Sequence, residues 1–129
     1  MANRPSKARY TKTHEWVVVE GDSATVGITD FAVEHLGDLV FVQLPDVGRV
    51  LKAGDAAAEV ESVKAVGEVY APVSGTVTAT NAGLAGDQAP LAKEPFTKGW
   101  LFKVKVKPGA GSDLMDLATY ERQLASEAK

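Results

Sequence analysis

Lys64 lies in a short segment, ESVKAVGEVYAP, in which a single amine could carry out chemistry. A lysine amine can be acylated, which removes its charge and attaches a group to a long, flexible stem. A carrier domain needs such an amine held out from a rigid turn. The simpler interpretation is a solvated turn lysine that offsets the repulsion between its flanking residues, Glu61 and Glu68. The residues themselves leave both interpretations open.

The period of the apolar residues changes at Lys64. Small and apolar residues fall on even numbers before it and on odd numbers after it, which indicates two strands joined by a hairpin. With Lys64 and Ala65 as the two loop residues, the hairpin register follows. It pairs Val63 with Val66, Ser62 with Gly67, Glu61 with Glu68, Val60 with Val69, and Ala58 with Ala71. Like charges that face each other are destabilising, and a locally unfavourable pairing hints at function.

The composition excludes several classes of protein. The chain has 129 residues, 45% of them hydrophobic and 24% charged, with a formal net charge of −3. A nucleic-acid-binding domain is usually basic, so we expect no nucleic-acid partner. The chain has no cysteine and therefore no disulfide framework, and it has no apolar run long enough to span a membrane. Its first residues lack the apolar stretch of a signal peptide, which favours a bacterial cytoplasm over a mitochondrial matrix.

Short strands separated by turn residues make up most of the chain. Alternating or β-branched runs predict strands at 16–20, 24–29, 38–44, 49–51, 56–63, 66–71, 76–80 and 100–106. Residues 81–99 are rich in glycine and proline and are predicted to be a loop. A short helix is predicted over 31–36 with Asp30 as its N-cap, and a longer amphipathic helix over about 112–126, capped by Ser112 or Asp113.

This order of elements predicts a mainly β fold, a small barrel or sandwich with a short internal helix and a docked C-terminal helix. We expect a flexible N-terminus over residues 1–9 and one domain over 10–129. The sequence shows no nucleophile–base pair, no metal-ligand spacing and no phosphate-binding glycine loop, so an enzyme is not expected.

The segments ESVKA (61–65) and YAPVSG (70–75) together resemble the lipoylation site of the glycine cleavage system H proteins. Four further segments resemble that family in the same order: YTKTHEWV (10–17), VGITDFA (26–32), LGDLVFVQLPDVG (36–48) and GWLFKVK (99–105). The resemblance runs from about Tyr10 to the terminal helix. It implies a barrel-sandwich hybrid of the lipoyl/biotinyl type.

The resemblance also implies a function for Lys64, which would carry lipoic acid in amide linkage. The protein would be a non-catalytic carrier and a monomer. It would take the aminomethyl group of glycine from glycine decarboxylase (the P-protein) to the aminomethyltransferase (the T-protein). Dihydrolipoamide dehydrogenase (the L-protein) would then reoxidise it. Lipoylating enzymes are further implied partners.

The family pattern implies roles for six more residues. Thr13, Glu15, His35 and Glu68 match the positions that protect the loaded arm, where a carboxylate can pair with the ammonium group of the cargo. Glu68 stands where many relatives have aspartate. His35 could equally be a solvated residue on a surface helix, and His14, next to Glu15, could be structural. Glu61 and Gly75 match the positions that lipoylating enzymes read, and Gly75 could also be a plain turn glycine.

Two alternatives to the glycine cleavage carrier remain at this point. One is an H-like protein that relays lipoyl groups to other enzymes. The other is a non-carrier β module that binds a partner through a sheet edge and merely exposes Lys64. The two carrier hypotheses require Lys64 to be modified, whereas the third does not.

Overall fold

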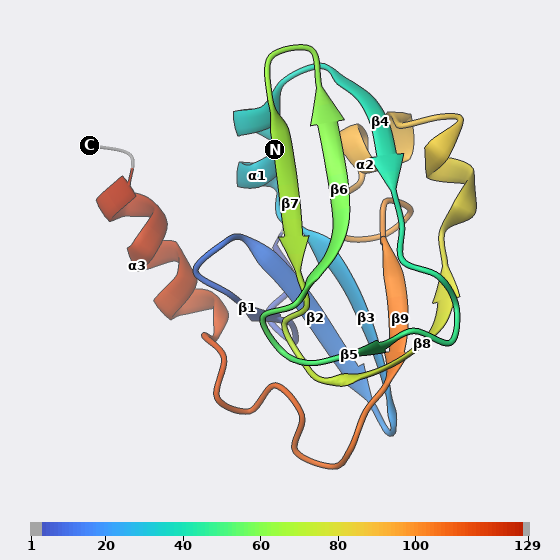
Figure 1. Cartoon of the computed structure of the whole chain (residues 1–129). Helices are drawn as coiled ribbons and strands as arrows, with labels where there is room; N and C mark the ends of the chain where they lie inside the picture. The colour runs from blue at the N-terminus through green and yellow to red at the C-terminus, as the bar shows by residue number, and fades with distance from the viewer. Residues whose placement is uncertain (1–3, 128–129) are drawn as a thin grey trace.

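In a computed structural model, which describes residues 4–127, the chain forms two antiparallel sheets with helices at their side (Figure 1). The six-stranded sheet has the order β1 (Arg9–Tyr10), β2 (Glu15–Glu20), β3 (Ser23–Ile28), β9 (Phe102–Lys105), β8 (Gly75–Thr80) and β5 (Val50–Leu51). The three-stranded sheet has the order β4 (Leu39–Gln43), β6 (Ala56–Ser62) and β7 (Val66–Tyr70). The core lies between the sheets and includes Val26, Val60 and Val104. This arrangement confirms the predicted barrel-sandwich hybrid.

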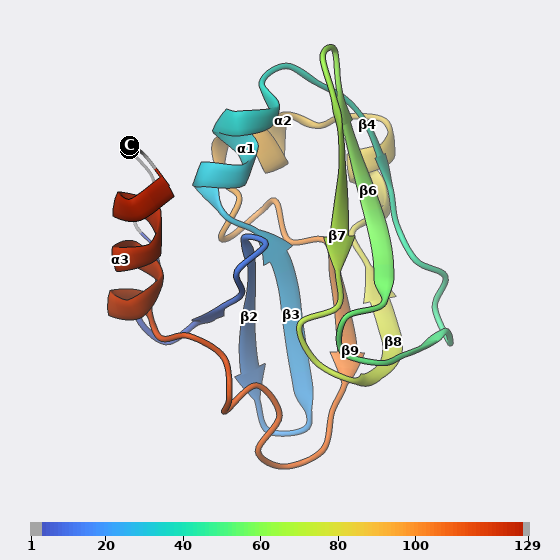
Figure 2. The same cartoon turned by 60° about the vertical axis from the view of Figure 1, so that its left-hand side comes forward.

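The helices are α1 (Asp30–Leu36), the 3₁₀ turn η1 (Ala82–Ala85), α2 (Ala89–Lys93) and α3 (Leu117–Glu127). Figure 2 shows α1 beside the upper part of β7 and α3 outside α1 and β2. The prediction of a loop throughout 81–99 was wrong, because η1 and α2 each bury one leucine, Leu84 and Leu91. These two helices are too short to show a helical period in the sequence, and the glycines and prolines around them are typical of loops.

Both predicted helix caps were displaced by one or more residues. The N-cap of α1 is Thr29, whose hydroxyl accepts from the Ala32 N–H, and Asp30 lies in the first turn instead. The C-terminal helix begins at Leu117, not near residue 112, and the Asp116 carboxylate accepts from the Thr119 N–H at 2.9 Å. An earlier start is blocked because Met115 exchanges two backbone hydrogen bonds with Tyr10, which keeps the chain extended there.

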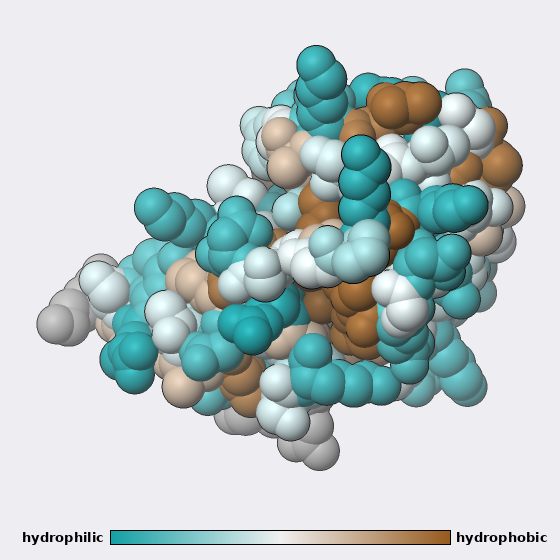
Figure 3. Space-filling model, turned by 90° about the horizontal axis from the view of Figure 1, so that it is seen from below, coloured by the Kyte–Doolittle hydropathy of each residue, from teal (hydrophilic) through white to brown (hydrophobic). Residues whose placement is uncertain are grey.

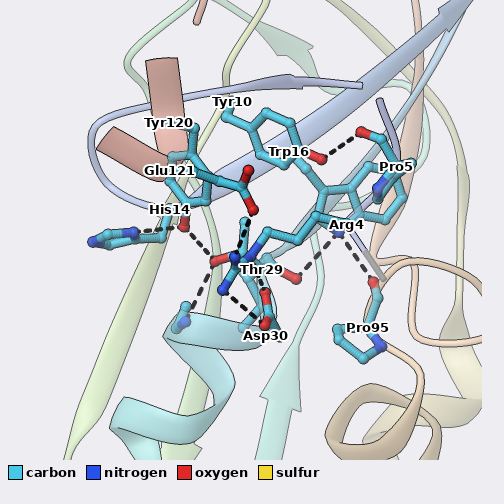
Figure 4. Close-up of polar contacts among 12 residues, drawn as sticks. Arg4, Pro5, Tyr10, His14, Trp16, Thr29, Asp30, Pro95, Tyr120 and Glu121 are labelled. Atoms are coloured by element: carbon cyan, nitrogen blue, oxygen red, sulfur yellow. Dashed lines mark hydrogen bonds and ion pairs between the residues drawn. The ribbon is translucent and has the colours of Figure 1, made fainter. Parts of the chain in front are cut away.

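Polar contacts hold α3 against the rest of the domain (Figure 4). The Tyr120 hydroxyl is 2.7 Å from Thr29 Oγ1 and 2.8 Å from His14 Nδ1. The Tyr120 ring stacks on Tyr10 at 4.7 Å between centroids. The Arg4 guanidinium pairs with Asp30 of α1 and, at 3.1 Å, with Glu121 of α3. The expectation of a flexible segment over 1–9 did not foresee these contacts of Arg4.

We expect Tyr120→Phe to lower the free energy of unfolding by about 1–3 kcal/mol, because the change removes one hydrogen-bond partner from the buried Thr29 hydroxyl and one from the half-buried His14 ring. Urea unfolding followed by tryptophan fluorescence measures the change. Tyr70→Phe is the matched control, since the Tyr70 side chain is partly exposed, and it should shift the midpoint far less. Equal shifts in the two variants would contradict the anchoring role of the Tyr120 hydroxyl.

Candidate functional site

Lys64 is at the tip of the β6–β7 hairpin, at one end of the molecule (Figure 1). The two residues of the turn are Val63 and Lys64, closed by a hydrogen bond from the Ser62 N–H to the Ala65 carbonyl at 2.8 Å. The Ser62 hydroxyl accepts from the Ala65 N–H at 3.0 Å. This serine supplies the turn stabilisation that an Asn-Gly pair would usually provide.

The predicted hairpin register was wrong by two residues. The strands pair Glu61 with Val66, Val60 with Gly67, Glu59 with Glu68 and Ala58 with Val69. Glu61 therefore does not face Glu68, and the predicted unfavourable pair of these two residues does not form. The apolar pattern fixes only which face each residue occupies, and a slip of two residues preserves every face. The turn closed by Ser62 and a register shift between Ala56 and Ala58 select one register among those that the apolar pattern permits.

The Lys64 side chain is exposed and lies beside the end of α1. A Cβ atom built on Gly37, the C-cap of α1, would be 3.5 Å from Lys64 Cε. The helix packs against the same hairpin farther down, where a Cβ on Gly67 would come within 3.1 Å of Leu36 Cδ2. Because the Lys64 stem and the helix α1 occupy the same side of the hairpin, a group extended from the amine can fold back between α1 and β7.

A cavity of about 270 Å³ lies at this place, between α1, β7, the 13–14 turn and the end of α3. Its lining includes three of the four residues expected to protect a loaded arm: Thr13, His35 and Glu68. Apolar side chains complete the wall, among them Phe31, Leu36 and Val60. Tertiary structure thus brings together residues that are 55 positions apart in the sequence, from Thr13 to Glu68.

Glu15, the fourth expected residue, is buried behind this wall with 1% of its surface exposed. The hydroxyls of Thr11 and Thr13 both donate to its Oε1, and the Tyr70 N–H donates to its Oε2 at 3.1 Å. Tyr70 ends β7, at the edge of the three-stranded sheet, whereas Glu15 begins β2 of the other sheet. The carboxylate therefore joins the two sheets, and it holds the hydroxyl of Thr13, a lining residue of the cavity.

Burial raises the pKa of the Glu15 carboxyl, against the opposing effect of its hydrogen bonds. The folded protein then binds this proton more tightly than the unfolded chain. The resulting stabilisation is complete below the ordinary value of 4.5 and is lost as the pH rises through the folded-state pKa.

We therefore expect the free energy of unfolding of the wild type, relative to Glu15→Gln, to fall as the pH rises above about 4.5, because glutamine does not titrate. Urea unfolding at a series of pH values measures this difference. Glu20→Gln, at the exposed end of the same strand, is the control. A difference between wild type and Glu15→Gln that stays constant with pH would count against the raised pKa.

The two residues expected to guide lipoylating enzymes lie apart. Glu61 is half-buried on β6, three residues before Lys64. Gly75 begins β8 and pairs with Leu51 of β5, which lies at the opposite end of the fold from the hairpin tip in Figure 1. A Cβ on Gly75 would be 2.2 Å from the Lys105 carbonyl oxygen, so the close approach of β8 and β9 itself requires glycine there.

A second cavity, of about 740 Å³, lies at the Gly75 end, between β5, β8 and the segment 105–113. Figure 3 views that end and shows apolar side chains recessed between hydrophilic ones. The cavity is larger than the one near Lys64, but none of the four residues expected to protect the arm lines it. Size alone would therefore not have identified the cavity beside the hairpin tip.

Two polar residues of the smaller cavity were not predicted to line it, His14 and Glu127. His14 was noted only as a structural alternative, although its position beside Glu15 in the THEW segment was a usable signal. No local signal marked Glu127, because it reaches the cavity only through the docking of α3. Among residues 4–127, no group of His, Asp or Glu side chains could hold a metal ion, and no helix is long and apolar enough to cross a membrane.

An exposed lysine on a hairpin tip, carried by two antiparallel sheets and next to a helix that lines a small cavity, is the arrangement of a carrier domain of the lipoyl/biotinyl type. The family model described as glycine cleavage H-protein matches residues 8–127. This chain belongs to that family, and membership implies the role of a lipoyl carrier.

Individual relatives agree with this assignment. The chain is 53% identical over 119 residues to the glycine cleavage system H protein of Phenylobacterium zucineum, covering 92% of this chain and 98% of that protein. It is 46% identical over 127 residues to the H protein of Rubrobacter xylanophilus, covering 98% and 99%. The crystal structure of an H protein from Mycobacterium marinum superposes with a TM-score of 0.86 at 41% identity, covering 95% of this chain and 99% of that one.

Proposed function

We propose that this protein is the lipoyl carrier of a glycine cleavage system and that Lys64 is its attachment site. The observation that carries the proposal is the position of Lys64, exposed at the hairpin tip and beside the cavity that holds Thr13, His35 and Glu68. The tip fits the group chemically: the amine is reachable by a modifying enzyme, and the partly apolar cavity next to it can receive an aliphatic arm with a polar end.

A lipoyl group in amide linkage to Lys64 would supply a reducible disulfide whose sulfur accepts the aminomethyl group of glycine. The chain itself contributes position and shelter. The rigid hairpin presents the arm to each partner in turn and raises its local concentration at a docked active site. The cavity excludes water from a labile cargo while the protein travels between enzymes.

The four arm-protecting residues divide this work between them. Glu68 faces the cavity and can pair with a cationic amine on the cargo. Thr13 and His35 add polar contacts to the same wall. Glu15 acts indirectly and does not contact the arm, because its carboxylate already accepts hydrogen bonds from two threonine hydroxyls and a backbone N–H. It is a positioning residue for Thr13 and for the end of β7.

For lipoylation itself we propose that Glu61 contributes directly, since it lies on the same hairpin as Lys64. Gly75 contributes through the backbone, because the packing of β8 against β9 demands glycine there. The two contributions are separable, since a change at Glu61 should slow modification without altering stability.

The carrier has glycine decarboxylase, the aminomethyltransferase and dihydrolipoamide dehydrogenase as its partners, together with lipoylating enzymes. Val63 and Val66 flank Lys64 with 76% and 59% of their surfaces exposed, and they offer these enzymes an apolar contact around the amine. The protein acts as a monomer without catalysing a reaction of its own. Because the relatives named above come from bacteria, we place it in a bacterial cytoplasm.

The experiment that tests this proposal is the mass spectrum of the whole protein after incubation with a lipoylating enzyme, lipoate and ATP. We expect the mass of one lipoyl group on the peptide that contains Lys64. The modified protein should then support glycine-dependent exchange of CO₂ with the decarboxylase. Absence of the adduct would overturn the carrier assignment. Modification without exchange would favour an H-like protein that relays lipoyl groups to other enzymes.

A further inference from the structure

The end of α3 forms part of the cavity wall beside the hairpin. Glu127, in the last turn of α3, lines the cavity together with Glu68 of β7. Its Oε1 is 3.2 Å from His14 Nε2, and its Oε2 accepts from the Gln123 side-chain amide at 2.7 Å. The carboxylate is therefore oriented, although 39% of the side chain remains exposed. α3 thus supplies an acidic group to a cavity otherwise built by the β domain and α1.

The His14 side chain holds the Glu127 carboxylate in place through a hydrogen bond. Its backbone has a φ of 72°, a conformation that non-glycine residues adopt uncommonly and that costs of order 1–3 kcal/mol. The ring packs against Phe31 at 4.6 Å between centroids. Both ring nitrogens have partners, Tyr120 and Glu127. A strained residue with both nitrogens engaged indicates that the position of the ring is determined by its surroundings and does not result from loose surface packing.

The charges that face the cavity favour a cation. Glu68 and Glu127 are its acidic lining residues, and His14 and His35 are its histidines. None of the described lining residues is a lysine or an arginine. A small cationic amine that enters the cavity would thus meet two carboxylates and no permanent positive charge, an arrangement in which charge-assisted hydrogen bonds are favourable.

We propose that Glu127 is a second arm-holding carboxylate, which α3 presents to the loaded arm from the wall opposite the hairpin. The proposal rests on the proposed carrier function. Glu68 approaches the cationic amine of the cargo from the hairpin and Glu127 from the helix. Release of the cargo to a partner enzyme then involves loss of the Glu127 contact. A purely structural Glu127 would merely fasten α3 to His14.

The test compares Glu127→Gln with Glu121→Gln, each in the lipoylated full chain loaded from glycine by the decarboxylase. Glu121 is on the same helix and contacts Arg4, away from the cavity, so it controls for the loss of one α3 carboxylate. After removal of the decarboxylase, mass spectra follow the loss of cargo with time. We expect Glu127→Gln to lose its cargo about threefold faster than wild type, the effect of a partly exposed ion pair. Glu121→Gln should match wild type.

A second measurement distinguishes two roles of Glu127: contact with the cargo of the arm, and attachment of α3 to His14. In wild type, loading should slow hydrogen exchange of the backbone amides in the last turn of α3, because the contact of the cargo with Glu127 stabilises that turn. In Glu127→Gln, loading should leave this exchange unchanged. If Glu127→Gln keeps its cargo as long as wild type, or if loading never protects α3, the inference is overturned and the carrier function stands. If wild type gains no lipoyl group, both proposals fail together.

Discussion

Lys64→Arg is expected to abolish the carrier function completely while leaving the fold intact. Arginine keeps the positive charge and length of the side chain but has no amine that a lipoylating enzyme can acylate. Because Lys64 is exposed at a turn, its replacement removes no buried contact, and the thermal midpoint should stay within about 1 °C of wild type. The mass spectrum should show no lipoyl adduct, and glycine-dependent CO₂ exchange should fall to background.

Lys52→Arg provides the matched control, because Lys52 is another exposed lysine, in the turn after β5. It should gain the lipoyl group at the rate of wild type. A lipoyl adduct on Lys64→Arg, or exchange activity in its absence, would show that the attachment site lies elsewhere or that the chain acts as a non-carrier module.

Gly75→Ala is expected to destabilise the domain strongly. The new Cβ would stand 2.2 Å from the Lys105 carbonyl oxygen, a distance at which the β8 and β9 backbones must separate. Overpacking of this kind costs about 1–3 kcal/mol and occasionally more. For a domain of this size we expect the thermal midpoint to fall by roughly 10 °C, which calorimetry or circular dichroism measures directly.

Gly83→Ala is the control for this substitution, because nothing lies within 4 Å of a Cβ built there and its midpoint should barely move. Lipoylation of Gly75→Ala well below its midpoint then separates the two roles of the glycine. Slow modification of the folded variant would support recognition through the backbone, and normal modification would make Gly75 purely structural. A midpoint equal to that of wild type would refute the close approach of β8 and β9.

Much of the fold followed from local pattern. Alternating residues predicted most strands to within one or two residues, and the phase change at Lys64 predicted the hairpin. The even–odd pattern of apolar residues cannot distinguish two hairpin registers that differ by two residues, because both registers keep the same side chains on the buried face. The Ser62 hydroxyl made that choice through its bond to Ala65, a local contact that the apolar pattern does not contain.

The site was predicted unevenly for a similar reason. Thr13, His35 and Glu68 were expected near the arm through resemblance, and the structure brings them to one cavity. Glu15 was expected in the same wall but is turned to Tyr70, because an edge N–H of β7 lies within its reach. Glu127 was not expected at all, since it is 63 positions from Lys64 in the sequence and reaches the cavity through the docking of α3, including the stacking of Tyr120 on Tyr10.

The sequence by itself determined that the chain is a small β domain, that a hairpin presents Lys64, and which family it resembles. Each of these depends on residues close together in the chain, whose periods and turns are set by local backbone geometry. Only the tertiary structure decided the close approach at Gly75 and the composition of the cavity. These depend on contacts between distant segments, where packing and hydrogen bonds select among arrangements that the local pattern permits equally.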